Sequence, residues 1–183
     1  NEGSAGLQNQ VKWVAPQEFQ RVQEESDDSD WGYESDLELY DDGDDWDARW
    51  RAQINLPDGA RIVSARWYLY NCGDDPDENS IDVWIGRVRP DAGGPTAWDQ
   101  ICYAETFTDS GYTSLLCDFN VPNNRTIRNN NFYYIAALEF DTGGCSDRRQ
   151  RFSGLKIVYR LQISPAPASH TFGDVYPTDW YYQ

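Results

Sequence analysis

Hydrophobic and polar residues alternate along several short stretches of this 183-residue chain. In "RIVSARWYLYN", residues 61–71, one alternating set is apolar and consists of Val63, Ala65, Trp67 and Leu69. Because successive side chains of a strand point to opposite faces of its sheet, this alternation predicts a strand with one buried face.

The same period of two recurs in "SIDVWIGRV" (80–88) and "LKIVYRLQI" (155–163), whereas "FYYIAALEF" (132–140) is apolar almost throughout and resembles a buried central strand. Turn residues separate such runs about every ten residues, and helical periodicity is nearly absent. We therefore predict an all-β fold, a β-sandwich of the jelly-roll type with roughly eight to ten strands.

The predicted sandwich spans residues 18–163 and is flanked by two extended tails. Residues 1–17 are polar except for "VKWV", and residues 164–183 begin with the Pro/Ala linker "SPAPASH". Two alternatives are open for the N-terminal tail. It adds a strand to the sheet edge of a neighbouring subunit, or it lies back on its own domain.

The four cysteines lack the close CxxC spacing of zinc or redox sites. "TDSG" (108–111) is expected to close a hairpin that places Cys102 opposite Cys117, while Cys72 and Cys145 each follow a predicted strand in a Gly/Asp loop. Of the three pairings that are available, we predict 102–117 and 72–145. Disulfides indicate an oxidising compartment.

Charge excludes two classes of partner. The formal net charge of −16 argues against nucleic acid and against anionic membrane surfaces, which need a basic footprint.

No apolar run reaches the roughly 20 residues of a transmembrane helix, so no membrane insertion is predicted. The chain contains no Met, from which we expect an extracellular or cell-surface protein whose signal peptide has been removed. An aromatic content of 15% is too high for a disordered acidic chain.

Acidic residues crowd three predicted loops. Between Arg21 and Arg49 there are thirteen Asp or Glu residues and no Lys, Arg or His. Because crowded carboxylates repel and hard oxygen ligands suit Ca²⁺, the composition predicts a structural calcium site, with bare solvated loops as the alternative. The candidate ligands are Asp28, Asp30, Asp41, Asp42, Asp44, Asp45, Asp74, Asp75 and Asp77.

The sequence offers little for catalysis, and we predict no catalytic residue. The single histidine, His170, lies in the Pro/Ala linker, so a Ser-His or Cys-His nucleophile would have to be built around a tail. Glu105 and Glu139 lie in predicted strands, where a two-carboxylate glycosidase is a remote alternative to an ordinary polar face.

Aromatic residues at polar-face or loop positions suggest a binding role. Trp84, Tyr68, Tyr70 and Trp98 could form flat platforms for sugars, and packing in the core or at a subunit interface would explain the same residues.

Two stretches resemble known families. "LPDGARIVSARWYLYNC" (56–72) followed by "IDVWIGRV" (81–88) resembles a group of secreted bacterial β-sandwich surface domains with an LPxGA turn, and the similarity covers most of residues 50–163. The C-terminal "TFGDVYPTDWYY" (171–182) resembles the start of an S-layer-homology repeat, with the F-x-D-V-x4-W spacing at Phe172, Asp174, Val175 and Trp180. Only about twelve residues match, so this resemblance implies wall anchoring for a longer precursor. The resemblance implies a secreted or cell-surface bacterial protein.

These observations favour an extracellular structural protein: a calcium- and disulfide-stabilised subunit that assembles with copies of itself into a homopolymeric filament or surface layer. The alternative is a carbohydrate-binding or adhesive module of the same fold, with a cell-wall polysaccharide as partner. Two or three coplanar Trp or Tyr rings facing solvent would favour the alternative, whereas aromatic residues buried against a neighbouring chain would favour assembly.

Overall fold

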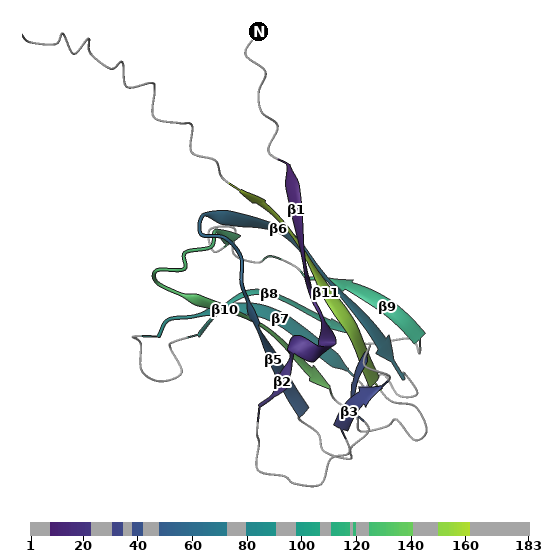
Figure 1. Cartoon of the computed structure of the whole chain (residues 1–183). Coiled ribbons are helices and arrows are strands. Elements are labelled where there is room, and N and C mark those ends of the chain that lie inside the picture. Colours follow the sequence, from purple (N-terminus) through teal and green to yellow (C-terminus); the bar gives the residue numbers. More distant parts are fainter. Residues whose placement is uncertain are drawn as a thin grey trace, which may run out of the picture.

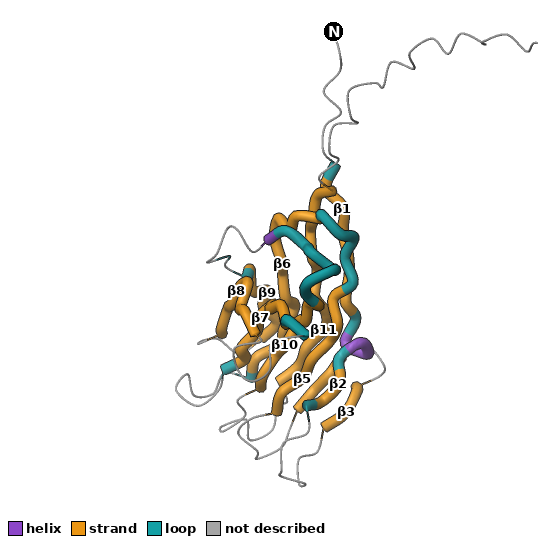
Figure 2. Tube along the Cα trace, turned by 90° about the vertical axis from the view of Figure 1, so that its left-hand side faces the viewer, coloured by secondary structure: helices purple, strands orange, loops and turns teal. Residues whose placement is uncertain are grey.

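Two antiparallel β-sheets pack face to face in the computed structural model (Figures 1 and 2). The structure describes residues 8–22, 31–34, 38–41, 48–72, 80–90, 98–106, 111–117, 119, 125–140 and 150–161. Within these ranges, no helix is long and apolar enough to cross a membrane.

Sheet A contains β3 (Trp31–Glu34), β4 (Glu38–Asp41), β11 (Gln150–Leu161), β6 (Ala60–Asn71) and β9 (Gly111–Leu116), paired in that order. The strand β1 (Asn9–Val14) also pairs with β11 in this sheet. Sheet B contains β2 (Gln20–Arg21), β5 (Ala48–Ile54), β10 (Tyr133–Phe140), β7 (Ile81–Val88) and β8 (Trp98–Thr106), again in that order. A single 3₁₀ turn, η1 (Pro16–Glu18), connects β1 to β2 within the described residues.

The connectivity is that of a jelly roll. From β4 onward, successive strands change sheet at every step except from β7 to β8, which gives the orders β4-β11-β6-β9 and β5-β10-β7-β8. This interleaving of two four-stranded sheets defines the jelly roll. The predicted all-β sandwich is therefore confirmed, and 132–140 is the central strand that its composition predicted, between β5 and β7.

The core lies between the two sheets and is rich in aromatic rings. Phe19 packs edge-on against Phe152 at 4.7 Å between ring centroids and against Trp67 at 6.1 Å, and all three side chains are buried. Trp50 and Tyr134 of sheet B are buried as well. Rings of this size bury enough apolar area to dominate the stability of a domain of this length.

One detail of the predicted alternation in 61–71 is wrong. Ile62, and not Val63, enters the core with 1% of its surface exposed, whereas Trp67 and Leu69 are buried as predicted. The register moves from Ser64 opposite Val158 to Ile62 opposite Tyr159, so Val63 is an extra residue in β6. A β-bulge of this kind reverses the inward and outward positions on either side of it.

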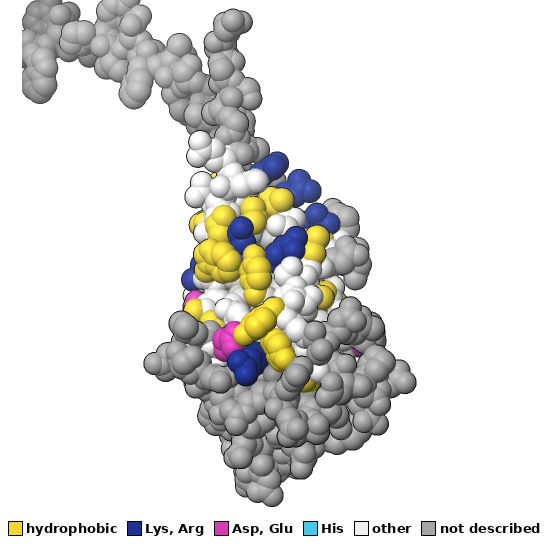
Figure 3. Space-filling model, turned by 90° about the vertical axis from the view of Figure 1, so that its right-hand side faces the viewer, with side chains coloured by type: hydrophobic (Ala, Val, Ile, Leu, Met, Phe, Trp, Pro, Cys, Tyr) yellow, Lys and Arg dark blue, Asp and Glu magenta, His cyan; other side chains and the backbone are white. Residues whose placement is uncertain are grey.

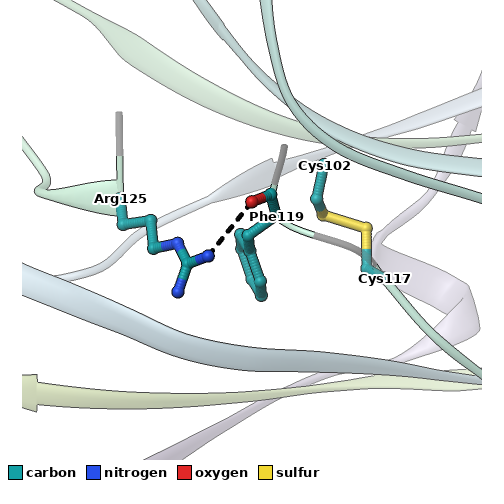
Figure 4. Close-up of a disulfide and its surroundings, with 4 residues drawn as sticks. All are labelled: Cys102, Cys117, Phe119 and Arg125. Carbon is teal, nitrogen blue, oxygen red and sulfur yellow. Dashed lines mark hydrogen bonds between the residues drawn. A yellow bond between two sulfur atoms is a disulfide. The ribbon is translucent and has the colours of Figure 1, made fainter. Parts of the chain in front are cut away.

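The predicted hairpin around 108–111 is also wrong, although the disulfide inferred from it is confirmed. β8 pairs with β7 in sheet B and β9 pairs with β6 in sheet A, so both are edge strands of different sheets. Cys102 and Cys117 are joined by a disulfide with a Cα–Cα distance of 5.6 Å, which ties the two sheets together at this edge (Figure 4). Turn residues indicate a reversal of the chain, but they do not say whether the chain returns to the same sheet.

Polar and aromatic contacts surround this bridge. The Arg125 guanidinium lies 4.7 Å from the centre of the Phe119 ring and donates a hydrogen bond of 3.0 Å to the Phe119 carbonyl oxygen (Figure 4). Cys72 is also disulfide-bonded. Its predicted partner, Cys145, lies outside the described residues, so the 72–145 pairing stays a prediction.

The N-terminal segment follows the second of its two alternatives in this structure. Residues 9–14 form β1 and pair with β11 of their own chain, from Asn9 opposite Arg160 to Val14 opposite Leu155. Val14 is fully buried, because it faces the core from this edge of sheet A. The ordered sandwich thus includes residues that precede position 18.

Candidate functional site

The outward face of sheet B carries a regular grid of side chains. The register places Arg51 of β5, Ala137 of β10, Trp84 of β7 and Tyr103 of β8 in one row across the sheet. The flanking core-facing residues of β10, such as Leu138, are buried in the sandwich, so Ala137 points to the opposite side. The row therefore presents two aromatic rings and one guanidinium around a very small residue.

A second row contains another residue with almost no side chain. Gln53, Ile135, Gly86 and Gln100 follow one another across β5, β10, β7 and β8. Gly86 is buried and lies diagonally next to Ala137. Two small residues thus meet on the face of the sheet that also carries a depression.

This depression is a hollow of about 510 Å³. Its apolar lining consists of Trp84, Tyr103, Tyr133, Ile135 and Val88, from three different strands. Tyr133 is 43% exposed, so its ring is accessible from the solvent. The volume falls within the range of about 300–1,000 Å³ that is usual for ligand pockets.

Polar groups complete the lining: Arg49, Arg51, Gln100 and Glu139. The Arg49 guanidinium binds Glu139 with two hydrogen bonds, from Nε to Oε2 at 2.9 Å and from Nη2 to Oε1 at 3.1 Å. This fork geometry holds both side chains in place. The hollow thus has fixed donors and acceptors beside its aromatic walls.

Tyr103 connects the hollow to a pair of carboxylates. Its hydroxyl lies 2.9 Å from Asp82 Oδ1 and 2.7 Å from Glu105 Oε2, and the two acids are opposite each other on β7 and β8. Burial, and then the hydrogen bonds to Glu105 and Asp82, raise the pKa of Tyr103 far above its ordinary value of 10.0. The phenol therefore stays protonated at neutral pH, and its one proton can be donated to only one carboxylate at a time.

The comparisons with known proteins come from structure alone. No family model matches the chain, and no curated protein matches its sequence. Among solved structures, a xylan-binding module, CBM15, has a TM-score of 0.46 at 11% identity and covers 82% of this chain and 97% of its own.

Two further solved structures are also carbohydrate-binding modules. A family 29 module from Piromyces equi has a TM-score of 0.42 at 11% identity, over 82% of this chain and 90% of that chain. A family 11 module from Clostridium thermocellum, in complex with a β-1,3-1,4-mixed-linked tetrasaccharide, has a TM-score of 0.34 at 13% identity, over 87% and 91%.

The predicted calcium ligands fall almost entirely outside the described part of the chain. Asp41 is the last residue of β4, and the other eight aspartates are not described. Within the described residues, no group of three or more His, Cys, Asp or Glu side chains is arranged to hold a metal ion. Calcium binding therefore stays a prediction.

The other residues that the sequence singled out do not lie together in one site. Glu105 and Glu139 lie on the outward face of sheet B, two strands apart, with Asp82 between them in the same row. His170 and the segment 171–182 are outside the described residues. The two carboxylates of the glycosidase alternative are thus both near the hollow. Each has its own hydrogen-bond partner, Tyr103 for Glu105 and Arg49 for Glu139.

The four candidate aromatic residues do not form one platform. Trp84 lines the hollow on sheet B, whereas Tyr68 and Tyr70 belong to β6 of sheet A. Trp98 is in β8, but its side chain is not described. Sequence reasoning missed Tyr133, because its alternating set in 132–140 contains Ile135 and Ala137, so that only Glu139 marks the outward face of the strand.

Proposed function

We propose that this chain is a carbohydrate-binding module whose ligand site is the hollow on sheet B. This is the alternative that the sequence left open beside filament assembly. The observation that carries it is the combination of Trp84, Tyr103 and Tyr133 with fixed polar groups in the lining of one hollow.

Sugars match this combination of surfaces. A pyranose ring has apolar C–H faces, which pack on aromatic rings, and a rim of hydroxyl groups that donate and accept hydrogen bonds. Gln100 supplies a donor and an acceptor, and Arg51 supplies donors, at the border of the same hollow. A wholly apolar ligand would leave these polar groups without partners, which costs binding energy.

The site is also held in shape before a ligand arrives. Arg49 and Glu139 are locked by two hydrogen bonds, and Tyr103 is fixed by its acidic neighbours. Side chains that are already ordered lose less conformational entropy on binding. The disulfide between Cys102 and Cys117 supports the same role in an extracellular setting, where such bridges persist.

The test is binding of the purified chain to a panel of soluble neutral polysaccharides: xylan, mixed-linked β-glucan, glucomannan and dextran. We expect at least one of them to bind in isothermal titration calorimetry. Replacing Trp84→Ala should weaken that binding by about tenfold, the value of an aromatic contact of roughly 1.4 kcal/mol.

Thr113→Ala is the control, since Thr113 is exposed in β9 of sheet A, away from the hollow. It should bind as the unaltered chain does. Equal affinity of the Trp84→Ala chain, or no binding to any member of the panel, would contradict the proposal. Self-assembly into a filament stays a prediction, and electron microscopy of the same sample would test it.

A further inference from the structure

The outward face of sheet A is a second surface with its own chemistry. Figure 3 shows hydrophobic side chains and Lys or Arg side chains together on this side of the molecule. One row across the face contains Trp13 of β1, Lys156 of β11, Arg66 of β6 and Leu116 of β9. Trp13 is 54% exposed and Leu116 56%, so the row is open to solvent.

Aromatic rings form two groups along this face. Trp13 and Tyr68 stack with their centroids 5.7 Å apart and their planes 29° from parallel. Tyr70 and Tyr112 meet at 5.0 Å with an angle of 67°. Alternate residues of a strand are spaced by about 6.6–6.8 Å, so the two groups follow one another along β6. The result is a run of aromatic rings along the face, of which Trp13 and Tyr68 are stacked and Tyr70 and Tyr112 are edge to face.

The cations on this face are not matched by acids. Arg61, Arg66, Lys156 and Arg160 form no ion pair with the described part of the chain; Arg66 donates to Ser114 Oγ and Arg160 donates to Asn9 Oδ1. At the far end of the face, by contrast, Arg151 is paired with Glu38. We call these four unpaired cations, with the rings of Trp13, Tyr68, Tyr70 and Tyr112, the cationic aromatic face.

Four unpaired cations on one face are unexpected in this chain. Lys and Arg number 15 against 31 Asp and Glu, so acids to pair with are abundant in the sequence. Lys156 Nζ also lies 5.7 Å from the centre of the Trp13 ring, which keeps the ammonium group near an exposed aromatic surface. A partner with negative charges and apolar faces would satisfy both properties.

We propose that the cationic aromatic face binds an acidic polysaccharide, a chain of sugars of which some carry carboxylates. Its ring faces would pack on the tyrosines and Trp13, and its carboxylates would pair with Arg66 and Lys156. Arginine is suited to this because its planar fork accepts a carboxylate through two hydrogen bonds.

The net charge distinguishes this ligand from denser polyanions. Duplex DNA carries one charge per about 1.7 Å, and a chain with a net charge of −16 repels such a charge density. A polysaccharide with one carboxylate per sugar or fewer is repelled less. At physiological salt, charges farther than about 8 Å are largely screened, so the local cations decide the contact.

The experiment measures binding of the full chain to polygalacturonate at 0.05 and about 0.15 M salt, the range over which screening is substantial. Methyl-esterified polygalacturonan, polyglutamate and duplex DNA are the comparison ligands. We expect polygalacturonate to bind most tightly and more weakly at higher salt. Arg66→Gln and Lys156→Gln should each weaken it by about fivefold, as for an exposed ion pair, and Trp13→Ala by about tenfold.

This proposal does not depend on the hollow of sheet B, and variants in the two sites distinguish binding at one from binding at the other. Trp84→Ala should lose neutral polysaccharide and retain polygalacturonate, whereas the Arg66→Gln/Lys156→Gln chain should do the reverse. Both arginine and lysine are at the surface, so these variants keep the fold, which circular dichroism verifies. The proposal is overturned if polygalacturonate does not bind, if the double variant binds it as before, or if polyglutamate or DNA binds as tightly.

Discussion

Removing the bridge between the two sheets should destabilise the domain by an amount that its loop length sets. Cys102 and Cys117 are separated by 15 residues and are both buried. On the chain-entropy model, a closed loop of this length stabilises the folded state by about 3 kcal/mol, because it restricts the unfolded chain. Replacing both residues by Ala should therefore lower the free energy of unfolding by about 3 kcal/mol.

Because native contacts surround the bridge, we expect the loss of free energy of unfolding to lie above this value rather than below it. The Cys117 amide donates a hydrogen bond of 2.9 Å to the Ala65 carbonyl oxygen, which keeps the end of β9 against β6. For a domain of this size, 3 kcal/mol corresponds to a fall in Tm of roughly 6–12 °C.

Urea denaturation, followed by Trp fluorescence, measures the change directly. The midpoint should fall, and Thr113→Ala, an exposed residue of β9, should change the free energy of unfolding by less than about 0.5 kcal/mol. A loss below about 1 kcal/mol for the Cys102→Ala/Cys117→Ala chain would refute the reasoning that the bridge restricts the unfolded chain.

The other predictions concern ionisation, backbone conformation and metal. Burial raises the pKa of Tyr103 and of Tyr134 above 10.0, so an alkaline titration at 295 nm should contain a late phase above the ordinary range of tyrosine. The stabilisation that comes from keeping these two phenols neutral is complete below about pH 10, where unfolded tyrosine is also neutral, and it is lost as the pH rises further. The Tyr103→Phe variant should show a smaller late phase in the titration. Gly154 has φ +147° and lies in β11 beside the Val14 carbonyl oxygen, so Gly154→Ala should cost about 1–3 kcal/mol in urea denaturation, and an unchanged midpoint would contradict this. If calcium binds the acidic loops, EDTA should lower Tm by a few degrees, since a site with a dissociation constant near 0.1 mM contributes about 1.4 kcal/mol at 1 mM calcium; an unchanged Tm would remove the calcium hypothesis.

Alternation along the sequence predicted the sandwich and most of its core, because residues such as Trp67 and Ile85 obey a strict period of two. It failed at Val63, where a bulge inserts one residue without a signal in the composition. It also failed to separate the sheets at β8 and β9, since the position of a returning strand depends on contacts that are distant in the sequence.

The candidate site was only partly predictable for the same reasons. Trp84 is visible as a large aromatic residue between Val83 and Ile85, which belong to the core. The hollow beside it requires Trp84, Tyr103 and Tyr133 to meet, and these residues come from three strands that are far apart in the sequence. Trp13 was assigned to a tail, so its stacking with Tyr68 could not be foreseen.

The pairing of β1 with β11 has a consequence for how the domain joins other protein. Asn9 lies opposite Arg160, so the first and last described strands begin and end at one corner of the sandwich, a single strand spacing of about 5 Å apart (Figure 1). A unit whose two connections leave side by side can be inserted into a surface loop of a host protein without forcing that loop open. In such a fusion the host would attach at one corner, beside Arg160 at the end of the cationic aromatic face.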